Sequence, residues 1–424
     1  MKASESVTRE ISRCRICGND ELFPILNLGE QCFTGIFPRE AAPEAPRGPL
    51  ELVKCQAGGG EDACGLVQLR HSSNPGLMYG ENYGYRSGLN RAMVEHLRAK
   101  VTALGRRAGL RAGDAVVDIG SNDGTLLGLL PEGQFTLVGI DPTGAKFRKY
   151  YRGDIELIED FFSAQACEAA LGGRRAQLVT SIAMFYDLER PLDFMRQVHD
   201  VLAADGLWHL EQSYLPAMLD HQAYDTVCHE HLEYYALKQI RWMAQRAGLK
   251  IIDVQFNDVN GGSFAVTLAR AESPLAVDTV LVEKILGQEA ARGLDGRGVY
   301  EEFGRRVAAH REALRGLLSR LHGQGRLVLG YGASTKGNVV LQYCGLSRAE
   351  IPYIAEVNAD KFGCVTPGTR IPIISEAEAH ALRPDCFLVL PWHFRGTLLE
   401  RERDFLRRGG RMIFPLPEIE VVAS

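Results

Sequence analysis

Four cysteines near the N-terminus offer the first recognisable chemistry, which is metal binding. Cys14 and Cys17 are two residues apart, a spacing at which two thiolates of one tight turn bind the same tetrahedral zinc ion. Cys55 and Cys64 form a wider pair, in which GGGED looks like an insertion into a second knuckle. The residues between the pairs are rich in proline and lack helical periodicity. We therefore expect a loop-rich module that one structural Zn²⁺, bound by all four thiolates, stabilises.

A glycine-bearing turn offers a second chemistry, the binding of a small molecule. The β-branched segment AVVDIG ends in Gly120, Ser121, Asn122 and Asp123, and a helical pattern follows. Such a turn lets a ligand touch the backbone, and the helix start offers N–H groups. The turn is not G-x-G-x-x-G, and the carboxylate of Asp123 would repel a pyrophosphate. A ligand with cationic or hydroxyl groups is favoured, and S-adenosylmethionine fits that description.

The ends of the next strands carry side chains that suit the rest of this cofactor. Asp141, followed by Pro142, ends the segment FTLVGI, where an acid can bind both ribose hydroxyls. Asp160 and Phe161 follow LIE, with a carboxylate for the adenine amine and a ring for the base, and Met184 ends the next strand. A single Asp at a strand end is often only a helix cap. Several in this order predict an S-adenosylmethionine site.

A histidine pair offers acid–base chemistry. His229 and His231 lie in YDTVCHEHLEYY, between a fifth strand and an amphipathic helix. In an extended segment the two imidazoles point the same way and Glu230 points the opposite way. Near the carboxyl edge of the sheet they would supply a general base with a pKa near 6.5 and a neighbour that orients it. A second metal site, for which no third ligand is evident, and purely structural histidines are the alternatives.

Two tyrosines could assist this base. Tyr83 and Tyr85 lie on the linker that enters the central segment and share a face if the linker is extended. A hydroxyl from either residue, or the ring of His229, would face the oxygen of an enolate. Aromatic packing under the linker is an equally good interpretation.

The last third of the chain contains a second strand, glycine turn and helix start, RLVLGYGASTKGN. Its glycines match neither a dinucleotide fingerprint nor a Walker loop. A lysine at a helix N-terminus still suits a diphosphate, although a solvated cap is the alternative. Two further strands, IPYIAEVN and PDCFLVLPWHF, end in polar or aromatic residues. The candidate substrate-binding residues are Ser334, Lys336, Asn338, Glu356, Asn358, Trp392 and His393.

Length and composition indicate the domains that must position these side chains. With 424 residues, 46% of them apolar and 24% charged, the chain is globular and too long for one core. We expect a zinc-binding module (1–75), a core that binds S-adenosylmethionine (76–272), a helical connector (273–322) and a C-terminal α/β domain (323–424). The order of strand, glycine turn, strand-end acid and Asp-Phe in the core resembles class I methyltransferases, which implies a Rossmann-like α/β fold there, and the last domain should also be Rossmann-like.

Charge and hydropathy exclude several partners. The net charge of −5 without a basic block argues against a nucleic acid. No apolar run reaches the length of a membrane span, and the first residues do not resemble a signal peptide, so we expect a cytoplasmic protein. A reducing compartment also favours metal ligation for clustered cysteines among the ten. The oligomeric state, monomer or dimer, is open.

Together these motifs resemble the nucleotide-sugar C-methyltransferases of deoxysugar pathways. The resemblance rests on the four-cysteine module, GSNDG, HEH followed by aromatics, NGGSF, GYGASTKGN and TPGTRIPI, and it spans the chain. It implies methylation of a carbon next to a ketone, usually C3 of a 4-keto-6-deoxy sugar carried on dTDP or another nucleotide. It also implies that His231 is the base and that residues 323–424 form a nucleotide-sugar-binding domain. Cys228 stands where the family has tyrosine, and Tyr224, Tyr234 or the Tyr83/Tyr85 pair could replace it.

Carbon methylation has a chemical logic that these residues can serve. Removal of a proton α to a ketone gives an enolate, and hydrogen-bond donors stabilise its oxygen. The enolate carbon must then lie in line with the sulfonium methyl group, so positioning should supply much of the acceleration. Methylation of oxygen or nitrogen on a sugar or other small metabolite is the first alternative. A non-catalytic scaffold with a zinc module is the second.

Overall fold

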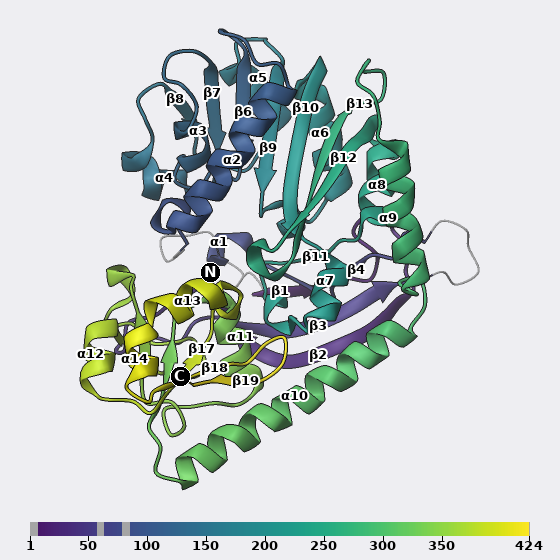
Figure 1. The fold of residues 1–424 in the computed structure, drawn as a ribbon. Helices are drawn as coiled ribbons and strands as arrows, with labels where there is room; N and C mark the ends of the chain where they lie inside the picture. Colours follow the sequence, from purple (N-terminus) through teal and green to yellow (C-terminus); the bar gives the residue numbers. More distant parts are fainter. Residues whose placement is uncertain (1–6, 57–62, 79–84, 424) are drawn as a thin grey trace, which may run out of the picture.

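The structure, a computed structural model, describes residues 7–56, 63–78 and 85–423. Figure 1 shows an open α/β sheet above, an N-terminal sheet beneath it, and a C-terminal α/β unit beside that sheet. The long helix α10 (Gly298–Gly323) runs under the N-terminal sheet to the C-terminal unit. Among the described residues no helix has both the length and the apolar character needed to cross a membrane.

The central sheet has the strand order β12-β13-β10-β9-β6-β7-β8, in which only β13 runs antiparallel to its neighbours. The segments predicted as strands form it: β6 (Ala115–Ile119), β7 (Thr136–Ile140), β8 (Ile155–Ile158), β9 (Ala176–Ile182), β10 (Leu202–Ser213), β12 (Leu249–Asn257) and β13 (Ser263–Arg270). A parallel sheet needs apolar side chains on both faces. This strand order confirms the class I methyltransferase fold.

Helices cover both faces because alternate strand residues point to opposite sides. Val116 packs with helix α2 (Arg91–Arg107) and the short α3 (Thr125–Gly128). Val117 packs on the other face, in a cluster with side chains of α5 (Ala164–Ala170), α6 (Pro191–Val201), α8 (Leu237–Arg246) and α9 (Thr279–Ala291). The carboxyl ends of the parallel strands therefore remain the open edge for ligands.

The N-terminal module is a sheet, so the prediction of a loop-rich module is wrong. Its order is β11-β4-β3-β2, with β2 (Leu22–Cys32), β3 (Arg47–Cys55), β4 (Val67–Leu69) and β11 (Glu233–Tyr234). Apolar residues alternate along LFPILNL, and Leu26, Leu28, Leu50 and Leu52 are buried in a shared cluster. Strand β11 comes from the core, directly after His231, and thus joins the candidate base to this module. A separate pair, β1 (Thr8–Glu10) and β5 (His71–Ser73), completes it.

The C-terminal unit has a six-stranded sheet of order β16-β15-β14-β17-β18-β19. Its parallel strands are β14 (Val328–Tyr331), β15 (Ile354–Glu356), β16 (Ile373–Ser375), β17 (Cys386–Val389) and β18 (Arg411–Phe414), and β19 (Glu420–Val422) pairs antiparallel. Helix α11 (Thr335–Tyr343) follows β14. The strand, glycine turn and helix predicted at residues 326–338 are confirmed.

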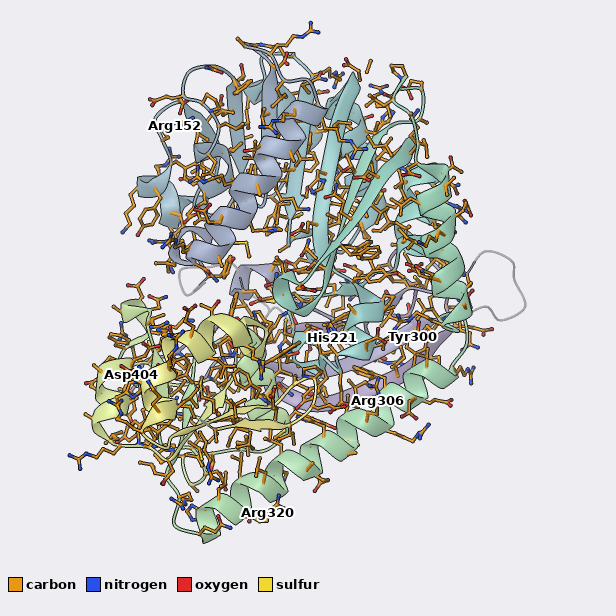
Figure 2. All side chains as sticks on the ribbon, viewed as in Figure 1. Arg152, His221, Tyr300, Arg306, Arg320 and Asp404 are labelled. Carbon is orange, nitrogen blue, oxygen red and sulfur yellow. The ribbon has the colours of Figure 1, made fainter. Side chains whose placement is uncertain are left out.

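Helix α10 connects the units through one buried stripe. Tyr300, Phe303, Val307 and Leu314 recur along one face and are almost fully buried. Figure 2 labels Tyr300, Arg306 and Arg320 along its length, and Arg306 donates a hydrogen bond of 2.5 Å to Leu219 O of the core. The helix therefore packs the core, the N-terminal sheet and the C-terminal unit against one another.

Candidate functional site

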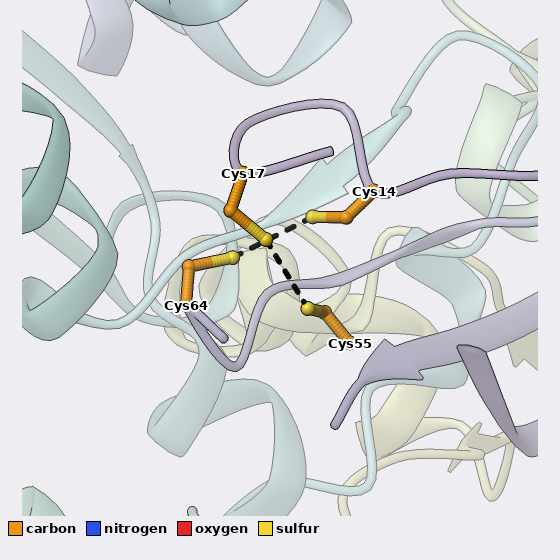
Figure 3. A group of neighbouring side chains, drawn as sticks. All are labelled: Cys14, Cys17, Cys55 and Cys64. Carbon is orange, nitrogen blue, oxygen red and sulfur yellow. Dashed lines mark hydrogen bonds between the residues drawn. The ribbon is translucent and has the colours of Figure 1, made fainter. Parts of the chain in front are cut away.

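The four predicted zinc ligands converge from two loops (Figure 3). The sulfur atoms of Cys14 and Cys64 are 3.5 Å apart, and those of Cys17 and Cys55 are 3.4 Å apart. Gly18, at φ +74°, closes the first turn with a hydrogen bond from its N–H to Cys14 O. The four sulfur atoms lie within 4.8 Å of one another. Four cysteine ligands are typical of a closed structural zinc site, so these residues fit a zinc ion.

Gly120 begins the predicted cofactor turn at the end of β6, and Met184, which follows β9, lies against it. Gly120 has φ +77°, and a Cβ atom there would lie 2.9 Å from Met184 Cγ. Ser121 is nearly buried, and its hydroxyl lies 2.8 Å from the hydroxyl of Tyr151. Gly120 thus leaves room for the Met184 side chain, which any larger residue at this position would displace.

Asp141 lies directly opposite this turn at the end of β7. Its Oδ2 accepts a hydrogen bond from Asn122 N at 2.8 Å, and its Oδ1 accepts one from Thr143 N at 2.7 Å, across Pro142. The carboxylate is 7% exposed. Because a carboxylate has about four acceptor positions, it keeps capacity for ribose hydroxyls. The position fits S-adenosylmethionine.

Asn122 and Asp123, which we predicted as ligand contacts, hydrogen-bond the linker in this structure. They hold the linker helix η1 (Ser87–Leu89): Asn122 Oδ1 accepts from Ser87 N at 2.9 Å, and Asp123 Oδ2 accepts from Gly88 N at 3.0 Å. Asp123 also accepts from Thr125 N at 3.3 Å, at the start of α3. The two side chains therefore anchor the linker to the turn.

The predicted adenine residues lie at the end of β8 and are open to solvent. Phe161 is 53% exposed, and Asp160 accepts a hydrogen bond from its N–H at 2.7 Å. An exposed aromatic ring suits stacking on a base. Of the two linker tyrosines, Tyr85 accepts a hydrogen bond on its backbone oxygen from Asn122 Nδ2 at 3.2 Å, while Tyr83 lies outside the described residues.

A buried charged cluster supports the strand end next to Met184, and sequence reasoning missed it. Glu211 on β10 accepts from His96 Nε2 at 2.5 Å and Lys100 Nζ at 2.8 Å. Burial alone would raise the pKa of Glu211, but His96 and Lys100 lower it to about 2. The backbone oxygen of Glu211 binds Ala183 N at 2.7 Å. The spacing of His96 and Lys100, four residues apart on one helix face, was the available signal.

Removal of the Asp141 charge tests the cofactor site. We expect Asp141→Asn to weaken S-adenosylmethionine binding about 10- to 100-fold, because charged hydrogen bonds contribute about 1.5–3 kcal/mol. Calorimetric titration measures it. Asp154→Asn is the matched control, since Asp154 also accepts a backbone N–H, from Gly133 at 3.0 Å, but pairs with Arg152 at the protein surface. Equal affinity in both variants would contradict the assignment.

The histidine segment is a tight turn, so the prediction that His229 and His231 share a face is wrong. His231 N donates to Cys228 O at 3.1 Å, which reverses the chain. His229 points to the N-terminal module: its Nε2 hydrogen-bonds Gly48 O at 3.0 Å, and its ring lies 4.5 Å from that of Phe33. It is 1% exposed, and its Nε2 is already hydrogen-bonded in this structure.

His231 is oriented as a base. Its Nδ1 lies 2.8 Å from Thr226 O and must donate there, so Nε2 carries the free lone pair. The ring packs edge-on against Tyr186 at 4.3 Å. Burial, and to a lesser degree the charge of Lys336, lower the pKa of His231 to about 4. The imidazole is therefore neutral and able to accept a proton at neutral pH.

Two neighbours complete the turn. The side-chain atoms of Cys228, Glu230 and His231 that could bind a metal ion lie within 4.8 Å of one another. Burial raises the pKa of Glu230 to about 7, and burial also raises that of Cys228. The space that His231, Thr226 and Tyr186 line measures about 10 Å³, room for about one water molecule. A sugar beside His231 therefore requires these side chains to move.

The tyrosines that could replace the family residue at Cys228 are engaged elsewhere. Tyr224 is fully buried, and its hydroxyl hydrogen-bonds His310 Nδ1 at 3.1 Å. Tyr234 donates to Thr226 O at 3.1 Å, the same oxygen that fixes His231. Tyr234 thus supports the base through its anchor.

The predicted substrate residues of the C-terminal unit divide into two groups. Those that hold the fold include Ser334, whose hydroxyl caps α11 at Gly337 N, and Asn338, which is fully buried and donates to Thr34 O at 2.7 Å. Glu356 likewise accepts from Ala333 N at 2.9 Å and so holds the loop after β14. These three side chains hold neighbouring backbone groups in this structure, and their role as substrate contacts stays a prediction.

The other group faces the core. Lys336 turns inward and donates to Asn260 O at 2.8 Å, so it is not the solvated helix cap that was the alternative to a diphosphate contact. Trp392 Nε1 donates to Asp225 Oδ2 at 2.8 Å. His221, labelled in Figure 2, lies at the same boundary, 6.4 Å from the Trp392 ring. His393 is adjacent, and burial lowers its pKa to about 3.

A groove of about 610 Å³ lies where the N-terminal module, the linker, the core and the C-terminal unit meet. The predicted residue Asn358 lines it. Aromatic rings there carry cations: Arg86 lies 4.1 Å from the ring centre of Tyr150, and Lys361 lies 4.3 Å from that of Phe37. The charged lining residues are Arg39, Arg86, Lys146, Lys149 and Lys361 against Glu44 and Asp360. The groove is therefore basic and suits an anion with an aromatic base.

The chain matches three family models in succession. A zinc binding domain covers residues 14–79, a methyltransferase domain residues 90–254, and a C-methyltransferase C-terminal domain residues 258–417. C-methyltransferase NovU from Streptomyces niveus is 32% identical over 423 residues, 99% of each chain.

Two solved methyltransferase structures each match less than half of this chain. An O-methyltransferase family protein from Burkholderia thailandensis is 19% identical with a TM-score of 0.34, over 43% of this chain and 59% of its own. The CcbJ methyltransferase from Streptomyces caelestis is 15% identical with a TM-score of 0.33, over 42% and 90%.

The strand order and the glycine turn define an S-adenosylmethionine-dependent methyltransferase of class I. The full-length similarity is more specific: the chain belongs to the C-methyltransferase family with an N-terminal zinc-binding domain and a C-methyltransferase C-terminal domain. S-adenosylmethionine is its methyl donor, and the four-cysteine cluster is its zinc site.

Proposed function

We propose that this enzyme methylates a carbon α to the ketone, C3, of a 4-keto-6-deoxy nucleotide sugar. The observation that carries the proposal is the fixed tautomer of His231, whose Nδ1 donates to Thr226 O and whose Nε2 is left as a base. Removal of a proton from carbon needs such a base. The enolate that results can react with the methyl group without further activation. The resemblance of the chain to nucleotide-sugar C-methyltransferases supports the substrate class.

In the proposed reaction, His231 Nε2 takes the proton from C3. The C–H electron pair forms the C3–C4 double bond, and the negative charge moves to the oxygen at C4. When bound, S-adenosylmethionine supplies the electrophilic methyl group, to which C3 bonds as the carbon–sulfur bond breaks. The ketone re-forms, and His231 releases its proton to water. Glu230, whose pKa is raised to about 7 by burial, lies beside His231 and can exchange that proton.

The nucleotide end of the substrate is assigned to the basic groove. A diphosphate favours the lysines and arginines that line it, and a base favours the rings of Tyr150 and Phe37. We further propose a cytoplasmic location, because all ten cysteines are free thiols. The net charge of −5 fits a small-molecule partner better than a nucleic acid.

A panel of 4-keto nucleotide sugars tests the proposal. The full chain is incubated with S-adenosylmethionine carrying a ¹³C methyl group, and NMR identifies the atom that the label joins. We expect a new carbon–carbon bond at C3. A label on oxygen or nitrogen would contradict carbon methylation, and a label on another carbon next to the ketone would correct the position while keeping the mechanism.

A further inference from the structure

Lys336 enters the core from the C-terminal unit. It is the second residue of α11, and its Nζ donates to Asn260 O at 2.8 Å, on the loop between β12 and β13. Asn260 presents that oxygen from a left-handed backbone, at φ +56°. An ammonium has three donors, and the described residues accept only this one hydrogen bond from it. Two donor positions thus remain for a ligand.

Two elements that pack near this ammonium carry buried polar atoms without a partner among the described residues: η4 (Tyr224–Thr226) packs against α11, and η7 (Trp392–Phe394) packs against η5 (Val259–Gly261), which contains Asn260. Asp225 is fully buried on helix η4. Its Oδ2 binds Trp392, but its Oδ1 has no partner in the part of the chain that the structure describes. His393 Nδ1 is likewise buried and unpaired among these residues. Buried polar atoms are rarely left unpaired, so the arrangement points to a polar ligand.

The candidate base shares this helix. Asp225, on the helix η4 that packs against α11, is followed directly by Thr226, whose backbone oxygen accepts a hydrogen bond from His231. Lys336 lies near enough for its charge to lower the pKa of His231, after the larger effect of burial. The groups around His231 that can titrate or carry charge are Cys228 and Glu230 in its own turn, Tyr186, Tyr214, Asp225, Glu233, Tyr234 and Lys336. Among these groups, Lys336 carries the positive charge.

We propose that Lys336 is a catalytic residue that binds the substrate ketone and stabilises the enolate oxygen. The proposal rests on the proposed function. As His231 Nε2 takes the α proton and the C–H electron pair moves toward the ketone oxygen, the ammonium donates a hydrogen bond to that oxygen and keeps its own proton. Asp225 Oδ1 accepts from a neighbouring sugar hydroxyl. When C3 bonds to the methyl group, the carbon–oxygen double bond re-forms and the oxygen loses its negative charge, because the electron pair of the broken carbon–sulfur bond stays on the sulfonium sulfur and neutralises it.

Two observations favour the ketone over the diphosphate as the partner of Lys336. The ammonium points into the core toward Asn260, whereas the basic groove has other cations, such as Lys146 and Lys149, and does not include Lys336. His229 cannot take this role, because its Nε2 is bonded to Gly48 O.

The test compares Lys336→Met with the wild type in α-proton exchange. The full chain and a keto sugar from the panel are placed in deuterated water without S-adenosylmethionine. We expect exchange to slow about 10²- to 10³-fold, the usual loss for one donor to an oxyanion. The acidic limb of the exchange rate should also move to higher pH, because the charge that lowers the pKa of His231 is gone. Lys336→Gln, which can still bind Asn260 O, is the second variant.

Lys250→Met is the matched control. Lys250 lies at the start of β12, whereas Asn260 follows the end of that strand, and Lys250 Nζ also donates to a backbone carbonyl, Ser273 O, at 2.5 Å. It should exchange like the wild type. Exchange within threefold of the wild type in both Lys336 variants, with an unmoved acidic limb, would overturn the proposal. A raised KM with unchanged kcat would assign Lys336 to the diphosphate and overturn it too. If the wild type exchanges no ketone of the panel, the proposed function itself fails.

Discussion

Replacement of His231 by glutamine is expected to lower carbon methylation by about 10²- to 10⁴-fold, the usual contribution of a positioned general base. Glutamine can keep a hydrogen bond to Thr226 O, but it has no lone pair of comparable basicity to take a carbon-bound proton. Steady-state kinetics with the methylated sugar as product measures the loss, and titration with S-adenosylmethionine should show unchanged cofactor affinity. His199→Gln, on the surface of α6, is the matched control.

The pH dependence of the wild type provides an independent check on this base. His231 acts when neutral, and its pKa is lowered to about 4, first by burial and then by Lys336. The rate should therefore stay constant down to about pH 4.5 and fall below pH 4 as the imidazole becomes protonated. An acidic limb near 6.5, the ordinary histidine value, would contradict the buried geometry. A limb that persists in His231→Gln would assign the base elsewhere.

The second large effect is expected from loss of the zinc ion. Cys55→Ser removes a fully buried ligand that joins the end of β3 to the loop of Cys14 and Cys17. Structural zinc binding contributes about 10–16 kcal/mol in small zinc modules, so the N-terminal sheet should lose its order in this variant. We expect no stoichiometric zinc, a lower melting temperature and lower activity, because this sheet includes β11, next to His231.

Cys32→Ser is the matched control for that experiment. Cys32 is equally buried and ends β2 in the same sheet, but its sulfur is not in the four-cysteine cluster. This variant should keep one zinc ion per chain and a melting temperature close to that of the wild type. Zinc retained by Cys55→Ser at full occupancy would contradict the four-ligand site.

The parts of the fold that the sequence predicts are those set by local patterns. Apolar β-branched runs predict the strands of both α/β sheets, and Gly120 and Asp141 mark the cofactor edge because a left-handed turn and a strand-end acid are local features. The spacing of Cys14 and Cys17 likewise predicts a shared metal. Each of these depends on few residues that are close in the chain.

The site around His231 could not be predicted because distant segments form it. The turn at Cys228 sends His229 to Gly48 and Phe33 of the N-terminal module, and these contacts override the alternation of an extended strand. Lys336 looks from sequence like a helix-start anion ligand, but docking of the C-terminal unit turns it toward Asn260. Sequence spacing does not encode which units pack together.

The most direct test of the central claim is exchange of the α proton in deuterated water without S-adenosylmethionine. The account predicts that the wild type introduces deuterium at the carbon next to the ketone of a 4-keto nucleotide sugar, and that His231→Gln does not, although it still binds the cofactor. If the wild type methylates carbon but His231→Gln exchanges deuterium at the wild-type rate, His231 is not the base and the account is contradicted.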